Sequence, residues 1–172
     1  MQPLWLDFIS ALKKPEYVHV LLNPLPVYGL AVGFLSLILA LIGRSRGAQA
    51  LALFIIFFST LSAWPVAHFG DAAYDRVRSM SDDNAQKWLN WHVHLADRIV
   101  LVYYATAAVA AAALAGLWNF PRLQRWTLPA TAVLAVVALG LGGLLAFAGG
   151  KIRHSEFRSH PPPAWANTAP DD

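Results

Sequence analysis

Six histidines are the side chains of this 172-residue chain best suited to chemistry, and they stand at positions 19, 68, 92, 94, 154 and 160. The neutral imidazole ring is a good ligand for haem iron, copper and zinc. The chain has no cysteine, which excludes disulfides, thiolate metal sites, iron–sulfur clusters and covalent attachment of a c-type haem. Histidine is therefore the leading candidate for holding a metal or a haem.

The elements that must position these histidines follow from the distribution of charge. The chain is 57% hydrophobic and 13% charged, and four segments contain no Asp, Glu, Lys or Arg: 17–43, 47–70, 99–121 and 126–150. Each is longer than the roughly 20 apolar residues that a helix needs to cross the hydrocarbon core. The sequence predicts an all-α integral membrane protein, a four-helix up-down-up-down bundle with spans at about 25–42, 48–69, 91–117 and 128–149.

The regions around the spans complete this architecture. Apolar residues at helical spacing within 3–17 predict a short N-terminal helix lying in the membrane interface. The polar segment 70–90 is expected to be a water-exposed connection that can contain a short helix. We expect one transmembrane domain over residues 1–158, and an extended or disordered tail over the proline-containing residues 159–172.

The orientation of the bundle follows from its loops. The connections holding Arg44, Arg46, Arg122 and Arg125 are short, basic and free of acidic residues, which favours a cytoplasmic position for them. The termini are then periplasmic, in the inner membrane of a bacterium. A net charge of only +3, divided among short segments, argues against a nucleic acid as partner.

In such a bundle all six histidines lie toward the same membrane face. His94 and His154 are the best-placed pair for a haem, because they belong to the third and fourth spans, which are neighbours in the sequence. His68 is the third candidate ligand. His92 is two residues from His94 and points to another side of the helix, so the two are not expected to grip one metal together. His19 serves in the same way as His68 or lies in the interface.

Charged residues beside His94 have roles that such a site would need. Asp97 is a candidate acceptor that orients an imidazole ring from behind. Arg98 and Arg153 are candidates for pairing with a haem propionate. The alternative is a local salt bridge at the membrane interface, because charges near a span end commonly reach toward water.

Two short stretches also resemble a known group of proteins. Leu-Asn-Pro-Leu-Pro at 22–26 and Gly-Gly-Lys-Ile-Arg-His-Ser-Glu at 149–156, together with Pro65 and His94, resemble an uncharacterised family of small bacterial four-helix membrane proteins. That family is itself similar to predicted haem-binding membrane proteins of the cytochrome b type. His94 and His154 match its pattern. Pro24 stands where the family tends to have a histidine, so a replacement ligand would be His19, His68 or His92.

Three functions remain open on this reading. The first is a b-type haem protein that transfers electrons between quinol and an extracytoplasmic redox partner such as a cytochrome, within a larger complex in the lipid membrane. The second is a non-catalytic accessory subunit, favoured by the small residues Gly142, Ala146 and Gly150, whose spacing suits tight helix packing in lipid. The third is a copper or zinc site on the outer face, formed by His68, His92, His94 and His154.

Overall fold

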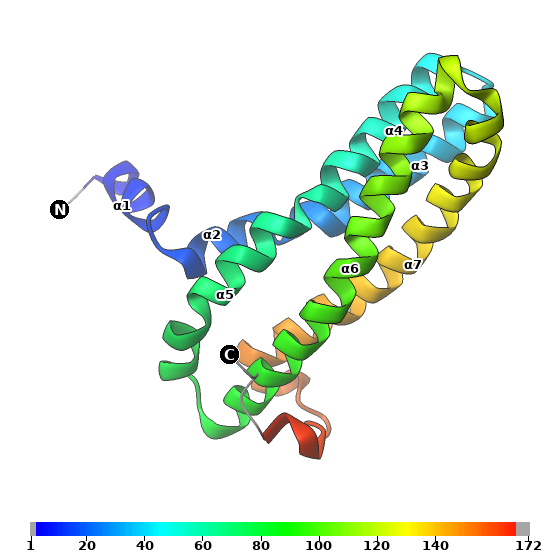
Figure 1. Ribbon diagram of the computed structural model, residues 1–172. Coiled ribbons are helices and arrows are strands. Elements are labelled where there is room, and N and C mark those ends of the chain that lie inside the picture. Colours follow the sequence, from blue (N-terminus) through cyan, green and yellow to red (C-terminus); the bar gives the residue numbers. More distant parts are fainter. Residues whose placement is uncertain (1–2, 168–172) are drawn as a thin grey trace. The chain divides into compact units, whose positions relative to one another are not determined.

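The computed structural model of the protein describes residues 3–167, so the predictions for residues 1–2 and 168–172 lie outside the described residues. The described part is helical and contains no strand (Figure 1). Its elements are α1 (Leu4–Ala11), α2 (Pro15–Leu22), the π-helical turn η1 (Leu25–Gly29), α3 (Leu30–Ile42), α4 (Arg46–Leu61), α5 (Ala63–Ser79), α6 (Asp83–Asn119), α7 (Pro121–Arg153) and the 3₁₀ turns η2 (Ser155–Phe157) and η3 (Ala164–Asn167).

Four helical segments are long and apolar enough to cross a membrane, and they run over Pro15–Ile42, Arg46–Ser79, Asp83–Asn119 and Pro121–Arg153. This confirms the all-α class, and the four long apolar helices agree with the four segments expected from the charge-free runs. Each helical segment extends beyond the corresponding expected span. The exposed side chains on these helices are largely apolar, as lipid contact requires.

The first helical segment begins ten residues earlier than the expected span because its prolines do not end the helix. Pro24 and Pro26 lie at and just inside the start of η1, a wider turn that accommodates the missing backbone donors. Helix continues on both sides of this turn, in α2 and α3. His19 therefore lies within a helix instead of preceding one.

The polar segment 70–90 is almost entirely helical, which is more helix than the short one expected there. Helix α5 continues to Ser79 and α6 begins at Asp83, so only residues 80–82 separate the two helices. Asp82 explains the early start of α6, because its Oδ1 accepts a hydrogen bond of 2.8 Å from the backbone N–H of Ala85. His92 and His94 consequently lie more than two turns inside α6 instead of at its beginning.

The chain forms two compact units. We call the first the histidine unit, since it holds all six histidines; its described residues are 3–23, 64–98 and 144–167. The second, residues 24–63 and 99–143, contains four arginines and no acidic residue, and we call it the apolar unit. Helices α6 and α7 contribute residues to both units.

The core of the apolar unit combines aliphatic side chains with small residues. Leu30, Leu37, Leu53 and Ile56 are completely buried where α3 packs against α4. Alanines of α6 and α7 are also fully buried, including Ala110, Ala113, Ala135 and Ala138. Small side chains bring helix backbones close together, which is the usual basis of helix association in lipid.

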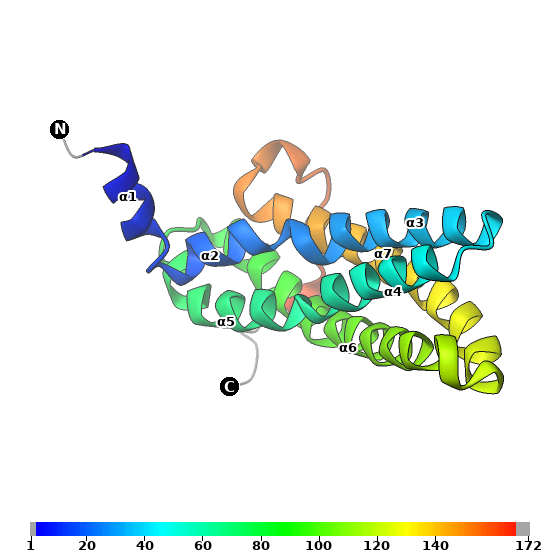
Figure 2. The ribbon, with the colours of Figure 1, turned by 90° about the horizontal axis from the view of Figure 1, so that it is seen from above.

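The core of the histidine unit is more aromatic and partly polar. Trp88, Leu89 and Ile152 form a buried cluster, and partly buried hydrophobic side chains of α5 and α6 pack around it: Tyr74, Val77, Trp91 and Val93. Within this unit α2 and α5 lie side by side in both views (Figures 1 and 2). Tyr74 donates a hydrogen bond of 2.7 Å to Asn90 Oδ1, and Asn90 Nδ2 donates one of 3.2 Å to the carbonyl of Ala166. This network ties the segment after α7 to α5 and α6.

Candidate functional site

His19 of α2 is held against α5 in a single orientation. Its Nδ1 lies 2.8 Å from the carbonyl oxygen of Val66. A carbonyl oxygen can only accept, so Nδ1 carries the proton, and the lone pair of the neutral ring is on Nε2. Metal-binding histidines are commonly fixed by a second-nitrogen hydrogen bond of this kind. The contact thus gives His19 the tautomer of an Nε2 ligand.

Gly70 makes this position of the ring possible. It follows Val66 by four residues, so the two lie one above the other on the same face of α5. A Cβ atom at Gly70 would lie 3.0 Å from both Cε1 and Nδ1 of His19. The imidazole therefore rests directly on the α5 backbone.

His92 of α6 occupies a comparable position against α7. A Cβ atom at Gly149 would lie 3.2 Å from Cε1 and 3.4 Å from Nδ1 of this ring. The backbone of Leu145, four residues before Gly149, forms a hydrogen bond with the imidazole. His92 Nδ1 is buried and has no hydrogen-bond partner. A buried polar nitrogen without a partner is costly, and a bound ligand would offset that cost.

These two histidines belong to one electrostatic cluster inside the histidine unit. The His19 ring interacts electrostatically with that of His92. Asp71 of α5 interacts in the same way with His19, His68 and Asp97. Two imidazoles from different helices, each lying on a glycine of another helix, therefore belong to the same unit.

His154 lies in different surroundings from these two rings. It follows the last residue of α7, its side chain is 54% exposed, and its Nδ1 lies 3.0 Å from Glu156 Oε1. The ring also stacks on Phe157 with the centroids 5.0 Å apart. The Glu156 backbone N–H and the His154 ring hold the pKa of the Glu156 carboxyl below its usual range. His154 is thus engaged at an exposed helix end.

The remaining residues expected at the site are divided between the interior and the surface. His94 is half-buried on α6, while Asp97, Arg98 and Arg153 are exposed. His68 is exposed on α5 and stacks on Trp64, with the ring centroids 5.9 Å apart and an interplanar angle of 9°. Of these residues, His68 and Asp97 share the electrostatic surroundings of Asp71.

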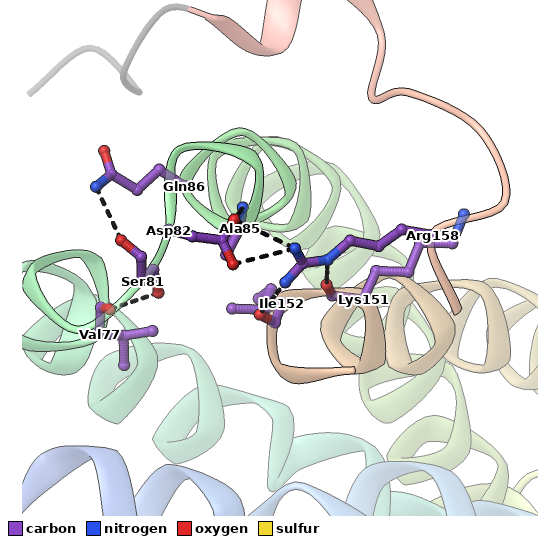
Figure 3. A network of polar contacts seen from close by, with 8 residues as sticks. All are labelled: Val77, Ser81, Asp82, Ala85, Gln86, Lys151, Ile152 and Arg158. Carbon is purple, nitrogen blue, oxygen red and sulfur yellow. Dashed lines mark hydrogen bonds and ion pairs between the residues drawn. The ribbon is translucent and has the colours of Figure 1, made fainter. Parts of the chain in front are cut away.

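Arg158 connects the end of α7 to the start of α6 (Figure 3). Its Nε and Nη2 donate to the carbonyls of Lys151 and Ile152 at 2.7 and 2.9 Å, and its Nη1 lies 3.2 Å from both carboxylate oxygens of Asp82. The Ala85 backbone N–H and the Arg158 guanidinium lower the pKa of Asp82. This contact holds the α6 and α7 ends that carry the aromatic core.

Among residues 3–167 there is no group of three or more His, Cys, Asp or Glu side chains arranged to hold a metal ion. A haem needs fewer protein ligands, because its tetrapyrrole supplies four nitrogens and the protein only the axial positions. Two imidazoles are enough for that group.

Sequence reasoning did not single out His19 as a primary ligand, and it did not find Gly70 and Gly149 as supports. The signal that could have identified His19 was its expected position toward the same membrane face as the other five histidines. The glycines had no comparable signal, because a glycine in an apolar helix is common and its contact depends on which neighbour faces it.

Comparison of the chain with protein-family models, curated proteins and solved structures finds no match, and the resemblance to a cytochrome b-like family stays a prediction.

Proposed function

We propose that the protein is a membrane-bound b-type haem protein that carries electrons between quinol and an extracytoplasmic redox partner, with His19 and His92 as the axial ligands. The observation that carries this proposal is the fixed tautomer of His19, whose Nδ1 donates to the Val66 carbonyl and leaves Nε2 for iron. The buried, unpartnered Nδ1 of His92 supports a ligand at the second ring. The geometry favours this pair over His94 and His154, because His154 is exposed and engaged by Glu156.

The chemistry of such a site is electron transfer. A haem whose two axial positions are both filled by histidine exchanges electrons without binding a substrate at iron. The contribution of the chain is to hold two imidazoles and to surround them with apolar helices that keep water away. Gly70 and Gly149 provide the space that the rings occupy.

We also propose the up-down-up-down topology in the inner membrane of a bacterium, with periplasmic termini and a short interfacial helix at α1. All ten acidic residues belong to the segments of the histidine unit, and the four arginines of the apolar unit have no acidic neighbours in their loops. Alkaline phosphatase fused after Asp172 should be active, and green fluorescent protein at the same position should be dark. The opposite pattern would reverse the orientation.

The test of haem binding is a reduced-minus-oxidised spectrum of the full chain purified in detergent. Wild-type protein should show the α and Soret bands of a b-type haem. His19→Ala and His92→Ala should each abolish or shift these bands, while His154→Ala, the matched control, should leave them unchanged. Bands that persist in both variants would overturn the ligand pair, and their absence from wild-type protein would overturn the haem proposal.

His94→Ala separates this ligand pair from the one expected from the sequence. His94 lies two residues from His92 on the same helix, so the two rings project from different sides of α6. Loss of haem in His94→Ala, with haem retained in His92→Ala, would make His94 the ligand of α6.

An accessory role is the second candidate function, and one observation favours it. Gly140 and Gly143 of α7 have no atom of another residue within 4 Å of the position a Cβ would take, so this small-residue face of the helix is open. Open small-residue faces permit close approach of another helix in lipid. Purified protein without haem, copper or zinc that co-purifies with other membrane subunits would favour this function.

A further inference from the structure

An open hollow lies where α6 turns into α7, at one end of the apolar unit (Figures 1 and 2). It has a volume of about 630 Å³ and is lined by five consecutive residues: Asn119, Phe120, Pro121, Arg122 and Leu123. Three of these residues are apolar, and the arginine adds a permanent positive charge. A molecule that fits this hollow therefore combines an apolar part with an anionic part.

The turn carries two positive charges that no acidic residue of the apolar unit can neutralise. Arg125 follows Arg122 by three residues, so the two side chains lie on the same side of α7 near its start. Both arginines are exposed, and residues 24–63 and 99–143 contain no Asp or Glu. Two neighbouring guanidinium groups attract a partner with a net negative charge and repel a headgroup that carries an ammonium of its own.

Exposed aromatic side chains on both sides of this turn are typical of a membrane surface. Trp118 near the end of α6 and Trp126 of α7 are 57% and 67% exposed. Tryptophan is enriched at the level of the lipid headgroups, because its ring is apolar and its N–H is polar. The Cζ atom of Arg125 lies 5.0 Å from the ring centroid of Trp126, which keeps the guanidinium beside the indole. The phosphates of phospholipids lie at this same level.

We infer that the hollow at the α6–α7 turn binds an anionic phospholipid, with Arg122 as the main contact to its phosphate group. The planar guanidinium donates two parallel hydrogen bonds to phosphate oxygens. Arg125 adds the second positive charge, while Phe120 and Leu123 offer apolar surface to the glycerol backbone and the first acyl carbons. Basic pockets between membrane helices bind anionic headgroups in this way. The site is in the apolar unit and does not depend on the proposed haem.

The experiment is native mass spectrometry of the full chain in detergent, titrated with phosphatidylglycerol or with phosphatidylcholine. Wild-type protein should bind phosphatidylglycerol more tightly. Arg122→Gln should weaken this binding about tenfold, the ratio expected for loss of one charge-assisted hydrogen bond. Its affinity for phosphatidylcholine should not change. Arg122→Lys keeps the charge but loses the paired donors, and its affinity should lie between those of wild-type protein and Arg122→Gln.

Arg46→Gln is the matched control, because Arg46 is also exposed and lies in the first turn of a helix, α4. The α3–α4 turn lies at the same end of the apolar unit (Figures 1 and 2), but Arg46 does not line the hollow. Its substitution should leave the affinity for phosphatidylglycerol nearly unchanged. Equal weakening by Arg46→Gln and Arg122→Gln would show a diffuse attraction to this end of the unit and overturn the inference. Equal affinity of wild-type protein for the two lipids would overturn it as well.

A second variant tests the apolar wall of the hollow at constant charge. Leu123→Asn should weaken phosphatidylglycerol binding, because the lipid loses apolar contact, and it should keep its helix content by circular dichroism, since Leu123 is exposed. Excess inorganic phosphate should not displace the lipid from wild-type protein, because a free ion gains nothing from that wall. Displacement by phosphate would assign the hollow to a free anion and overturn the inference, as would unchanged lipid binding in Leu123→Asn.

Discussion

The two units of the chain treat their buried polar side chains differently. In the apolar unit, the hydroxyls of Thr60, Thr106 and Thr131 each donate to the carbonyl one turn back in their own helix, at 2.7 to 2.8 Å. The hydroxyl of Tyr103 donates to the carbonyl of Ala138 at 3.0 Å. In the histidine unit, the buried Nδ1 of His92 has no such partner.

The contrast is sharpest where a ring lies on a glycine, because the same packing device is used in both units. Tyr103 lies over Gly142 and bonds to the carbonyl four residues earlier, as His19 does with Gly70 and Val66. Tyr103 is then fully satisfied, with one polar atom and one partner. An imidazole has two nitrogens, so even His19 retains one for another atom. The difference teaches that close helix packing is structural in one unit and leaves binding capacity in the other.

The largest expected effect tests the contact between Tyr103 and Gly142 in the apolar unit. Gly142→Ala would place a Cβ against the Tyr103 hydroxyl, and we expect the free energy of unfolding to fall by about 2 kcal/mol, as overpacking of a tight core does. Gly143→Ala is the matched control: its Cβ meets open space, and it should gain up to about 1 kcal/mol from helix propensity. Unfolding by SDS in mixed micelles measures both. Equal effects of the two substitutions would contradict the contact.

The next effect tests whether the histidine unit contains a buried polar atom without a hydrogen-bond partner when haem is absent. His92→Leu removes the unpartnered nitrogen, and we expect it to raise the free energy of unfolding of the haem-free protein by about 1 to 2 kcal/mol. The same variant should bind no haem. Destabilisation of the haem-free protein would show that the bond of His92 to the Leu145 backbone outweighs the cost of its unpartnered nitrogen, and would remove the contrast between the units.

A smaller effect of opposite sign is expected at Tyr103. Tyr103→Phe keeps the ring over Gly142 but removes the hydrogen bond to Ala138, and should lower the free energy of unfolding by about 1 kcal/mol. The same SDS titration measures it, and haem binding should not change. A loss of haem with no loss of stability would extend the functional region into the apolar unit.

The smallest effect concerns the ion pair between Asp82 and Arg158 in the histidine unit. The folded-state pKa of Asp82 is lowered, so the carboxylate contributes stability at pH values above its unfolded pKa, and this contribution is lost as the pH falls through the folded pKa. Asp82→Asn should therefore lower the thermal midpoint slightly at neutral pH and leave it close to that of wild-type protein in acid, so that its acid-induced fall is smaller. The exposed Asp75→Asn serves as the control. An identical acid limb in wild-type protein and Asp82→Asn would show that the ion pair with Arg158 adds nothing.

The amino-acid sequence by itself determined the helical class and the four helices that are long and apolar enough to cross a membrane. Long charge-free runs leave the backbone no partner in lipid except its own carbonyls, so helix is the outcome wherever such a run occurs. The sequence also predicted that the six histidines lie at one end of the helices, and all six belong to one compact unit. The early start of α2 could not be read from Pro24 and Pro26, because the π-helical turn depends on the backbone geometry available there.

Only the tertiary structure decided how each histidine is engaged. Helical periodicity gives the direction of a ring from its own axis, but the carbonyl of Val66 and the backbone of Gly149 come from segments 47 and 57 residues away. The same applies to Lys151, whose position after a charge-free run suggests a solvated end, whereas Trp88 and Phe147 enclose it. Burial and hydrogen bonding are properties of neighbours, and the neighbours are chosen by packing of the whole unit.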